Sequence, residues 1–72
     1  MKQKVDARGL SCPQPVLMAM QAMRAKGSGE IEVVVDNEAS RENVSRAAQS
    51  QGWSVVLDEL DGGEFRLSLA KS

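Results

Sequence analysis

The chain has 72 residues, of which 42% are hydrophobic and 26% are charged, and its formal net charge is −1. This length allows one domain with a modest core, and the near-neutral charge gives the molecule no general attraction to nucleic acid or to a membrane. There is one cysteine and no histidine. The composition therefore excludes an internal disulfide, a multi-cysteine metal site and a Cys–His catalytic pair. We expect no metal and no other cofactor.

The chain carries neither the apolar region of a signal peptide at its start nor an apolar run of membrane-spanning length. Together with the single cysteine, this favours a soluble, cytoplasmic protein, which we expect to be a monomer.

Charge is unevenly distributed along the sequence. Residues 1–28 carry five basic side chains and one acidic one, whereas residues 29–72 carry four basic and nine acidic ones. Two interpretations stay open. The positive segment could help to hold a thiolate and attract an acidic partner, or these could be ordinary solvated charges, because segments of a sequence are not patches of a surface.

The first predicted element is a short strand at residues 2–7, with Val5 as its main apolar residue. Residues 8–11 form a loop, in which we expect Gly9 to adopt a backbone conformation that other residues resist. Leu10 is placed to pack against the first turn of the helix that follows.

The stretch from Ser11 to Pro15 holds the only cysteine and both prolines. Proline is favoured in the first turn of a helix and excluded from its interior, so the stretch predicts a helix entered at Pro13 with Cys12 at or beside its N-cap. The free N–H groups and positive dipole there stabilise a thiolate, and the N–H of Gln14 is the natural partner for the sulfur. A lone cysteine is more often a small buried residue, but this setting favours a reactive one.

The first helix should extend from about residue 13 to about residue 26 and end at Gly27. Arg24 and Lys26 suit its negative C-terminal end. Leu17 and Met18 lie partly off the apolar stripe, and we favour packing over a protein contact for them. Helical spacing predicts a core-facing stripe of Val16, Ala19, Met20 and Met23.

The second half predicts a strand at residues 30–36, a helix at residues 40–51 and two strands, at residues 53–60 and 64–70, joined by a hairpin turn at residues 61–63. Ser40 or Ala39 should cap the helix and Gly52 should end it. The polar residues 36–38 could cap an element or line a pocket, although simple turn chemistry explains them equally well. The expected buried positions are Ile31, Val33, Val35, Val44, Ala47, Ala48, Trp53, Val55, Leu57, Phe65, Leu67 and Leu69.

This β-α-β-α-β-β order predicts an α/β two-layer sandwich, with a four-stranded mixed sheet and both helices on one face. Strands linked by a helix should run parallel, and the last two strands should form an antiparallel hairpin. Because Trp53 and Phe65 are both expected in the core, no aromatic surface remains for a direct nucleic-acid site.

Residues 6–15, DARGLSCPQP, resemble the signature of the TusA/SirA/YedF family of small sulfur-carrier proteins. The hallmark of that family is a CPxP motif at the start of the first helix, preceded by an Asp…Gly-Leu loop. The resemblance covers the whole chain in length and element order, and implies a fold similar to the C-terminal domain of a bacterial translation initiation factor. It also implies that Cys12 carries a persulfide. The other matching positions are Asp6, Gly9, Pro13 and Pro15.

Residues 35–44 and 51–53 are most similar to the YedF-like branch of the family. Some members of that branch have a further C-terminal domain and are associated with selenium metabolism. Residues 1–72 are accordingly expected to form one TusA-like domain, either alone or as the N-terminal domain of a longer protein.

The resemblance implies a sulfurtransferase-type carrier that relays sulfur, or selenium, from a protein donor such as a cysteine desulfurase to a protein acceptor. Whether the chain is an enzyme in its own right stays open. The alternative is a non-catalytic regulatory or interaction domain, in which Cys12 only marks a helix start. For Arg8 we favour a solvent-exposed loop charge over direct support of the sulfur. The residues expected to support Cys12 are Asp6, Arg8, Gly9, Pro13, Gln14 and Pro15.

Overall fold

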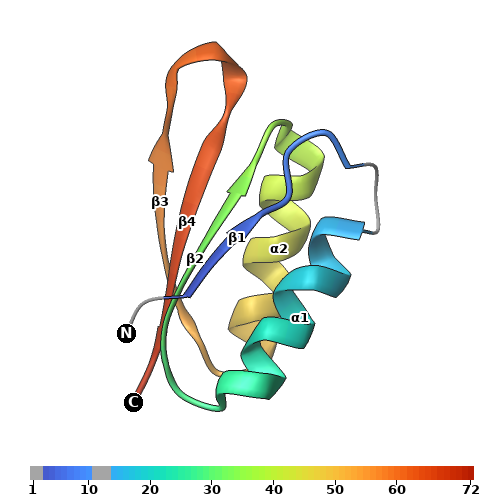
Figure 1. The fold of residues 1–72 in the computed structure, drawn as a ribbon. Helices are drawn as coiled ribbons and strands as arrows, with labels where there is room; N and C mark the ends of the chain where they lie inside the picture. Colours follow the sequence, from blue (N-terminus) through green and yellow to red (C-terminus); the bar gives the residue numbers. More distant parts are fainter. Residues whose placement is uncertain (1–2, 11–13) are drawn as a thin grey trace.

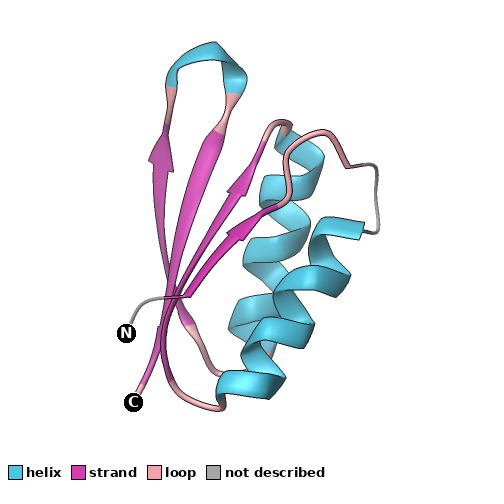
Figure 2. Cartoon of the chain, viewed as in Figure 1, coloured by secondary structure: helices cyan, strands magenta, loops and turns pink. Residues whose placement is uncertain are grey.

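The computed structural model describes residues 3–10 and 14–72. Both helices lie on the same face of a four-stranded sheet, so the predicted two-layer sandwich is confirmed (Figures 1 and 2). No helix among the described residues is both long enough and apolar enough to cross a membrane. In chain order, the helices and strands are β1 (Gln3–Asp6), α1 (Gln14–Lys26), β2 (Gly29–Val35), α2 (Glu38–Ser50), β3 (Ser54–Glu59) and β4 (Phe65–Lys71).

The strands lie in the order β1-β2-β4-β3. β1 pairs with β2 in parallel, and β4 lies between β2 and β3, antiparallel to both. β2 and β3, which α2 connects, therefore run in the same direction but are not neighbours. A 3₁₀ turn, η1 (Asp61–Gly63), joins β3 to β4, and the backbone N–H of Leu60 donates to the carbonyl of Glu64 at 2.8 Å. The predicted hairpin is confirmed.

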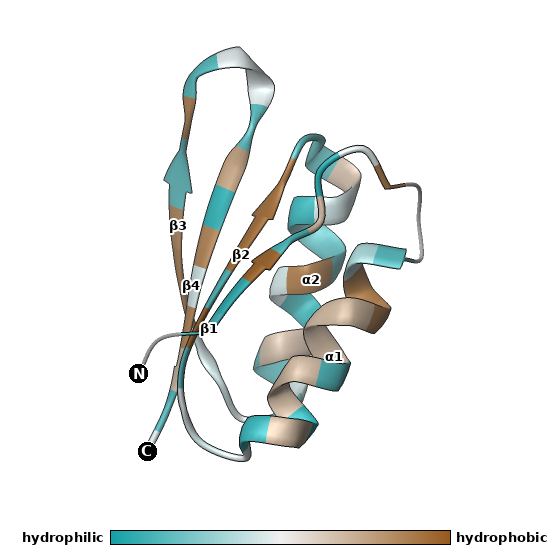
Figure 3. Ribbon diagram, viewed as in Figure 1, coloured by the Kyte–Doolittle hydropathy of each residue, from teal (hydrophilic) through white to brown (hydrophobic). Residues whose placement is uncertain are grey.

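The core lies between the two central strands and the helices. As predicted, β2 and β4 alternate buried and half-buried positions, and the strands and the covering helices turn their apolar residues toward one another. Figure 3 shows the apolar segments of β2 and β4 side by side. Complete burial of a valine, leucine or isoleucine side chain contributes about 1.5–3 kcal/mol. The fully buried hydrophobic core residues of the strands and helices are Ala19, Ile31, Val33, Val35, Val44, Ala48, Leu67 and Leu69.

The buried side of α1 differs from the prediction. Ala19 and Met23 are buried as expected, but Val16 and Met20 are only half-buried. Pro15 and Ala22 are buried in their place. The helix contacts both the sheet and α2, and the small or compact side chains on this side allow it to approach closely. The stripe predicted from hydrophobicity alone is therefore rotated about the helix axis by part of a turn relative to the side that is buried.

The start of α2 also differs from the prediction. Asn37, and not Ser40 or Ala39, is its N-cap, and the Asn37 side chain accepts a hydrogen bond from the backbone N–H of Ser40 at 2.7 Å. Asparagine ranks among the best N-cap residues because its side-chain oxygen satisfies a free N–H of the first turn. The helix consequently begins at Glu38, two residues earlier than predicted.

The remaining differences are small. Ala47 on α2 and Val55 on β3 are half-buried, and Leu57 is 43% exposed. β3 is an edge strand that the helices leave largely uncovered (Figure 1). Each strand bound differs from the predicted one by one residue. Gly27 ends α1 with φ +76° and an N–H donated to the carbonyl of Met23 at 2.8 Å, as predicted.

Candidate functional site

The candidate site lies where the chain passes from β1 to α1. Cys12 and Pro13, which the sequence places at its centre, are outside the described residues, as is Ser11. The structure therefore describes the two sides of the motif: the loop at Arg8, Gly9 and Leu10, and the start of α1.

The start of α1 suits a negatively charged group. The described helix begins at Gln14, which is exposed, and Pro15 is fully buried in its first turn. The ring of Pro15 fixes φ and at the same time packs in the core, so this end of the helix is held rigidly. The first turn contains no acidic side chain. Its positive dipole is therefore not offset by a carboxylate of its own.

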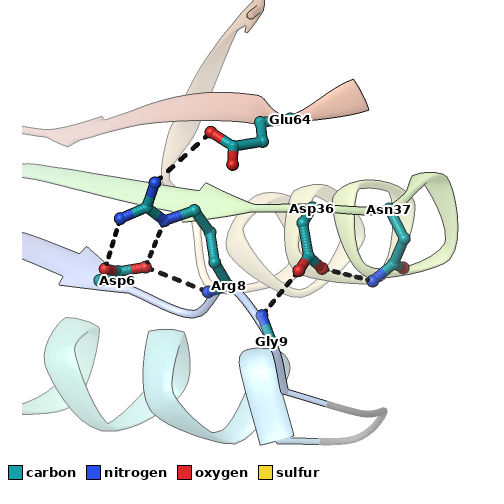
Figure 4. A network of polar contacts seen from close by, with 6 residues as sticks. All are labelled: Asp6, Arg8, Gly9, Asp36, Asn37 and Glu64. Atoms are coloured by element: carbon teal, nitrogen blue, oxygen red, sulfur yellow. Dashed lines mark hydrogen bonds and ion pairs between the residues drawn. The ribbon is translucent and has the colours of Figure 1, made fainter. Parts of the chain in front are cut away.

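A bidentate ion pair stiffens the loop before the motif. Arg8 Nε and Nη2 each lie 2.9 Å from a carboxylate oxygen of Asp6, and the backbone N–H of Arg8 donates to the same carboxylate at 3.1 Å. Arg8 Nη1 lies 3.5 Å from Oε1 of Glu64, the residue before β4. Figure 4 shows the guanidinium between the two carboxylates. Arg8 is 49% exposed, in agreement with the expected solvent-exposed loop charge, and it is also paired with carboxylates.

This ion pair shifts the pKa of both side chains, Asp6 and Arg8. The side-chain hydrogen bonds from Arg8 lower the pKa of Asp6 from 3.8 to about 2, with a smaller contribution from the backbone hydrogen bond. The same contact with Asp6 raises the pKa of Arg8 above its ordinary value. Both groups are charged at neutral pH, and exposed pairs of this kind are screened by solvent and salt.

A second contact holds the loop from the other side. The backbone N–H of Gly9 donates to Asp36 Oδ2 at 2.7 Å, and Asn37 Nδ2 donates to Asp36 Oδ1 at 3.1 Å (Figure 4). Gly9 has φ +76°, a left-handed conformation that a side chain would make unfavourable. The expectation for Gly9 is confirmed, and its conformation directs its N–H toward Asp36.

These contacts form one network, which joins the loop between β1 and α1 to the β2–α2 connection and to the start of β4. The sequence predicted Asp6, Arg8 and Gly9 as supporting residues, and the structure brings all three together. It did not predict Asp36, Asn37 and Glu64 as part of the site. The polar run at residues 36–38 was a signal for the first two, whereas nothing in the sequence indicated that β4 begins beside Arg8.

The structure favours the less specific interpretation of the basic segment. Arg24 and Lys26 lie in the last turn of α1, about 18 Å from its first turn at 1.5 Å per residue. That distance exceeds the Debye length of about 8 Å at physiological ionic strength, so these charges act weakly at the motif. Arg8 is itself paired with two carboxylates. Arg8, Arg24 and Lys26 therefore give an anion at the motif little support.

No group of three His, Cys, Asp or Glu side chains able to hold a metal ion lies within residues 3–10 and 14–72.

Comparison with known proteins relates the chain to one family. The profile of the family described as Sulfurtransferase TusA matches residues 3–71. A relative from Methanocaldococcus jannaschii is 39% identical over 69 residues, which are 94% of this chain and 92% of the relative. The sulfur carrier protein TusA of Allochromatium vinosum is 31% identical over 71 residues, 97% of this chain and 93% of its own. Relatives named TusA and YedF both occur among the matches.

The fold comparison gives the same result. The crystal structure of a SirA-like protein from Desulfitobacterium hafniense superposes with a TM-score of 0.91 at 32% sequence identity, over 100% of this chain and 99% of that one. The resemblance read from residues 6–15 is confirmed, and the chain belongs to the TusA family of sulfurtransferases.

Proposed function

We propose that this protein is a sulfur carrier that holds sulfane sulfur as a persulfide on Cys12. The single observation that carries the proposal is the membership of the chain in the TusA family over residues 3–71, in a sequence that contains one cysteine. The braced loop supports it because it holds the chain in place before the motif, and the first turn of α1 supports it because no acidic side chain there offsets the positive helix dipole.

The chemistry needs one nucleophile. The thiolate of Cys12 attacks the outer sulfur of a persulfide on the donor protein. The bond between the two donor sulfurs breaks, the inner sulfur leaves as the donor's thiolate, and Cys12 becomes a persulfide. Transfer to an acceptor thiolate repeats the same exchange in the other direction. The helix end stabilises the anion before and after the exchange.

The donor we propose is a protein such as a cysteine desulfurase, and the acceptor is a second protein. Both steps need free thiolates, which a reducing cytoplasm maintains. A donor that carries selenium would load Cys12 by the same attack, and the mass of the product distinguishes the two elements.

The test is intact mass spectrometry after incubation with a cysteine desulfurase and cysteine. The wild-type protein should gain one sulfur atom that a reductant removes, whereas Cys12→Ser should gain none. Pro15→Ala, which restores an N–H in the first turn, should still be loaded but with altered thiol reactivity. A wild-type protein that stays unmodified with several desulfurases would instead favour a non-catalytic interaction domain.

A further inference from the structure

The free edge of β3 is the least protected part of the sheet. Among the described strands, β3 pairs only with β4, so the N–H and C=O groups along its other edge have no strand partner. Its register with β4 is continuous from Ser54↔Ala70 to Glu59↔Phe65, without a bulge. The strand also contains no proline and no lysine, and its two charged residues, Asp58 and Glu59, are confined to its C-terminal end. Bulges, prolines and lysines are the usual devices that keep an edge strand from pairing with another chain.

Two large apolar side chains on β3 are exposed. Val56 is 61% exposed and Leu57 is 43% exposed. Successive side chains of a strand point to opposite faces, so Val56 lies on the open face of the sheet and Leu57 on the helix face. On the helix face, a groove of about 280 Å³ lies next to Leu57 and α2. A partner that docked on one face would cover only one of these side chains, whereas an added strand flanks both.

We propose that β3 pairs with β3 of a second copy of this chain, antiparallel and centred on Val56, to give a continuous eight-stranded sheet. The sequence of the strand is self-complementary in this register. On the open face, Val56 lies opposite Val56 of the second copy. On the helix face, Val55 of each copy lies opposite Leu57 of the other. Directly opposite apolar pairs of this kind stabilise antiparallel sheets.

The charges on the strand favour this register over the one centred on Leu57. Centred on Val56, the pairing places Asp58 opposite Ser54 of the second copy, and the two Asp58 side chains are about 13 Å apart along the strands. A register centred on Leu57 would place Val56 opposite Asp58 and Val55 opposite Glu59, which sets apolar side chains against carboxylates. A shift by a single residue would exchange the faces of every side chain.

The paired arrangement leaves the candidate site accessible. The loop that leads to Cys12 follows the carboxyl end of β1, on the strand farthest from β3 in the sheet order. Because the two β3 strands run antiparallel, the two motif loops would lie at opposite ends of the dimer. The pairing is thus independent of the sulfur chemistry, and it replaces the expectation of a monomer with a weak dimer that forms as concentration rises.

The first experiment is sedimentation equilibrium over a concentration series, with a reductant present because the single cysteine would otherwise form disulfide-linked dimers. The mass should rise from 7.8 kDa toward twice that value. Val56→Lys should keep the protein monomeric, since it places two ammonium groups opposite each other. Leu17→Lys is the matched control, because Leu17 is 51% exposed but lies on α1. A wild-type protein that stays monomeric at millimolar concentration overturns the proposal, as does a dimer that Val56→Lys leaves intact.

The second experiment tests the register in the Cys12→Ser background under mild oxidation. Residues directly opposite each other have Cα atoms about 4.5–5.5 Å apart, a separation that a disulfide can span. Val56→Cys should therefore cross-link rapidly. Leu57→Cys should not, because the two residues at position 57 would be about 8 Å apart across the diagonal. Equal rates for the two variants, or faster cross-linking at position 57, would exclude this register.

Discussion

The backbone N–H of Gly9 donates a 2.7 Å hydrogen bond to the carboxylate of Asp36, 27 residues further along the chain. This contact connects the loop before Cys12 to the connection between β2 and α2, so it fixes the direction from which the chain enters the motif. Asp36→Ala removes the acceptor, whereas Asp36→Asn keeps an oxygen that can accept the same hydrogen bond.

We expect Asp36→Ala to reduce the free energy of unfolding by about 1 kcal/mol and to slow the loading of Cys12. Asp36→Asn should restore most of both. Denaturant unfolding measures the first quantity, and the rate of sulfur gain by intact mass measures the second. If the asparagine variant loads as slowly as the alanine variant, the negative charge matters and the hydrogen bond does not.

The ion pair between Asp6 and Arg8 predicts a specific pH dependence. Because the pKa of Asp6 is about 2 in the folded protein and 3.8 is its ordinary value, ionised Asp6 stabilises the fold fully above about pH 4. That contribution is lost as the pH falls toward 2.

Arg8→Gln should return the pKa of Asp6 toward 3.8, as followed by NMR titration of the side-chain carboxyl group. The decrease in the free energy of unfolding at acid pH should then be smaller in the variant, because Asp6 no longer contributes to it. The free energies of wild type and variant should converge at low pH. The small net effect of exposed ion pairs makes the NMR titration the more sensitive measurement. An unchanged pKa in the variant would contradict the role that the geometry gives to Arg8.

The elements with the strongest hydrophobic periodicity were the ones that the sequence predicted best. Alternation in β2 and β4 is complete because helices cover one face and leave the other open, so Ile31, Val33, Leu67 and Leu69 were identified correctly. The buried side of α1 was less predictable, because a helix that contacts both a sheet and a second helix buries more than one stripe. Pro15 shows this, since its signal as a first-turn residue gave no indication that its ring lies in the core.

The supporting network could be predicted only in part, for a physical reason. Asp6 and Arg8 are two residues apart, and the local motif indicated both. The contacts of Asp36 with Gly9 and of Glu64 with Arg8 depend on how distant strands are arranged. Ser40 or Ala39 was predicted as the cap because the apolar stripe of α2 starts later. The alternative that residues 36–38 cap an element is confirmed at Asn37, whose side chain accepts a hydrogen bond from the N–H of Ser40.

Ser40 offers a test of the described packing. It is 2% exposed, and its hydroxyl oxygen has no hydrogen-bond partner among the described residues. A buried hydroxyl without a partner destabilises a protein, and alanine is the better helix former. Ser40→Ala should therefore raise the free energy of unfolding by up to about 1 kcal/mol, as measured by denaturant titration. A loss of stability would show that the hydroxyl has a partner outside the described residues.

We expect a substitution at Leu17 to slow sulfur transfer without changing the free energy of unfolding. It lies on the first turn of α1 after the motif and is 51% exposed, so its side chain contributes little to the core. Exposed leucines are common and need no special explanation, but Leu17 follows Cys12 by five residues in the sequence, and we expect it to contact a protein that exchanges sulfur with Cys12. Leu17→Glu should leave the free energy of unfolding within about 0.5 kcal/mol of wild type. It should also slow loading by a desulfurase several-fold, while the rate of alkylation by a small reagent stays within about twofold.

Gln21→Glu, one helical turn further along, adds the same charge at another exposed position and serves as the control. If both variants load equally slowly, the added negative charge alone explains the effect. If Leu17→Glu loads at the wild-type rate, Leu17 is not part of the docking surface.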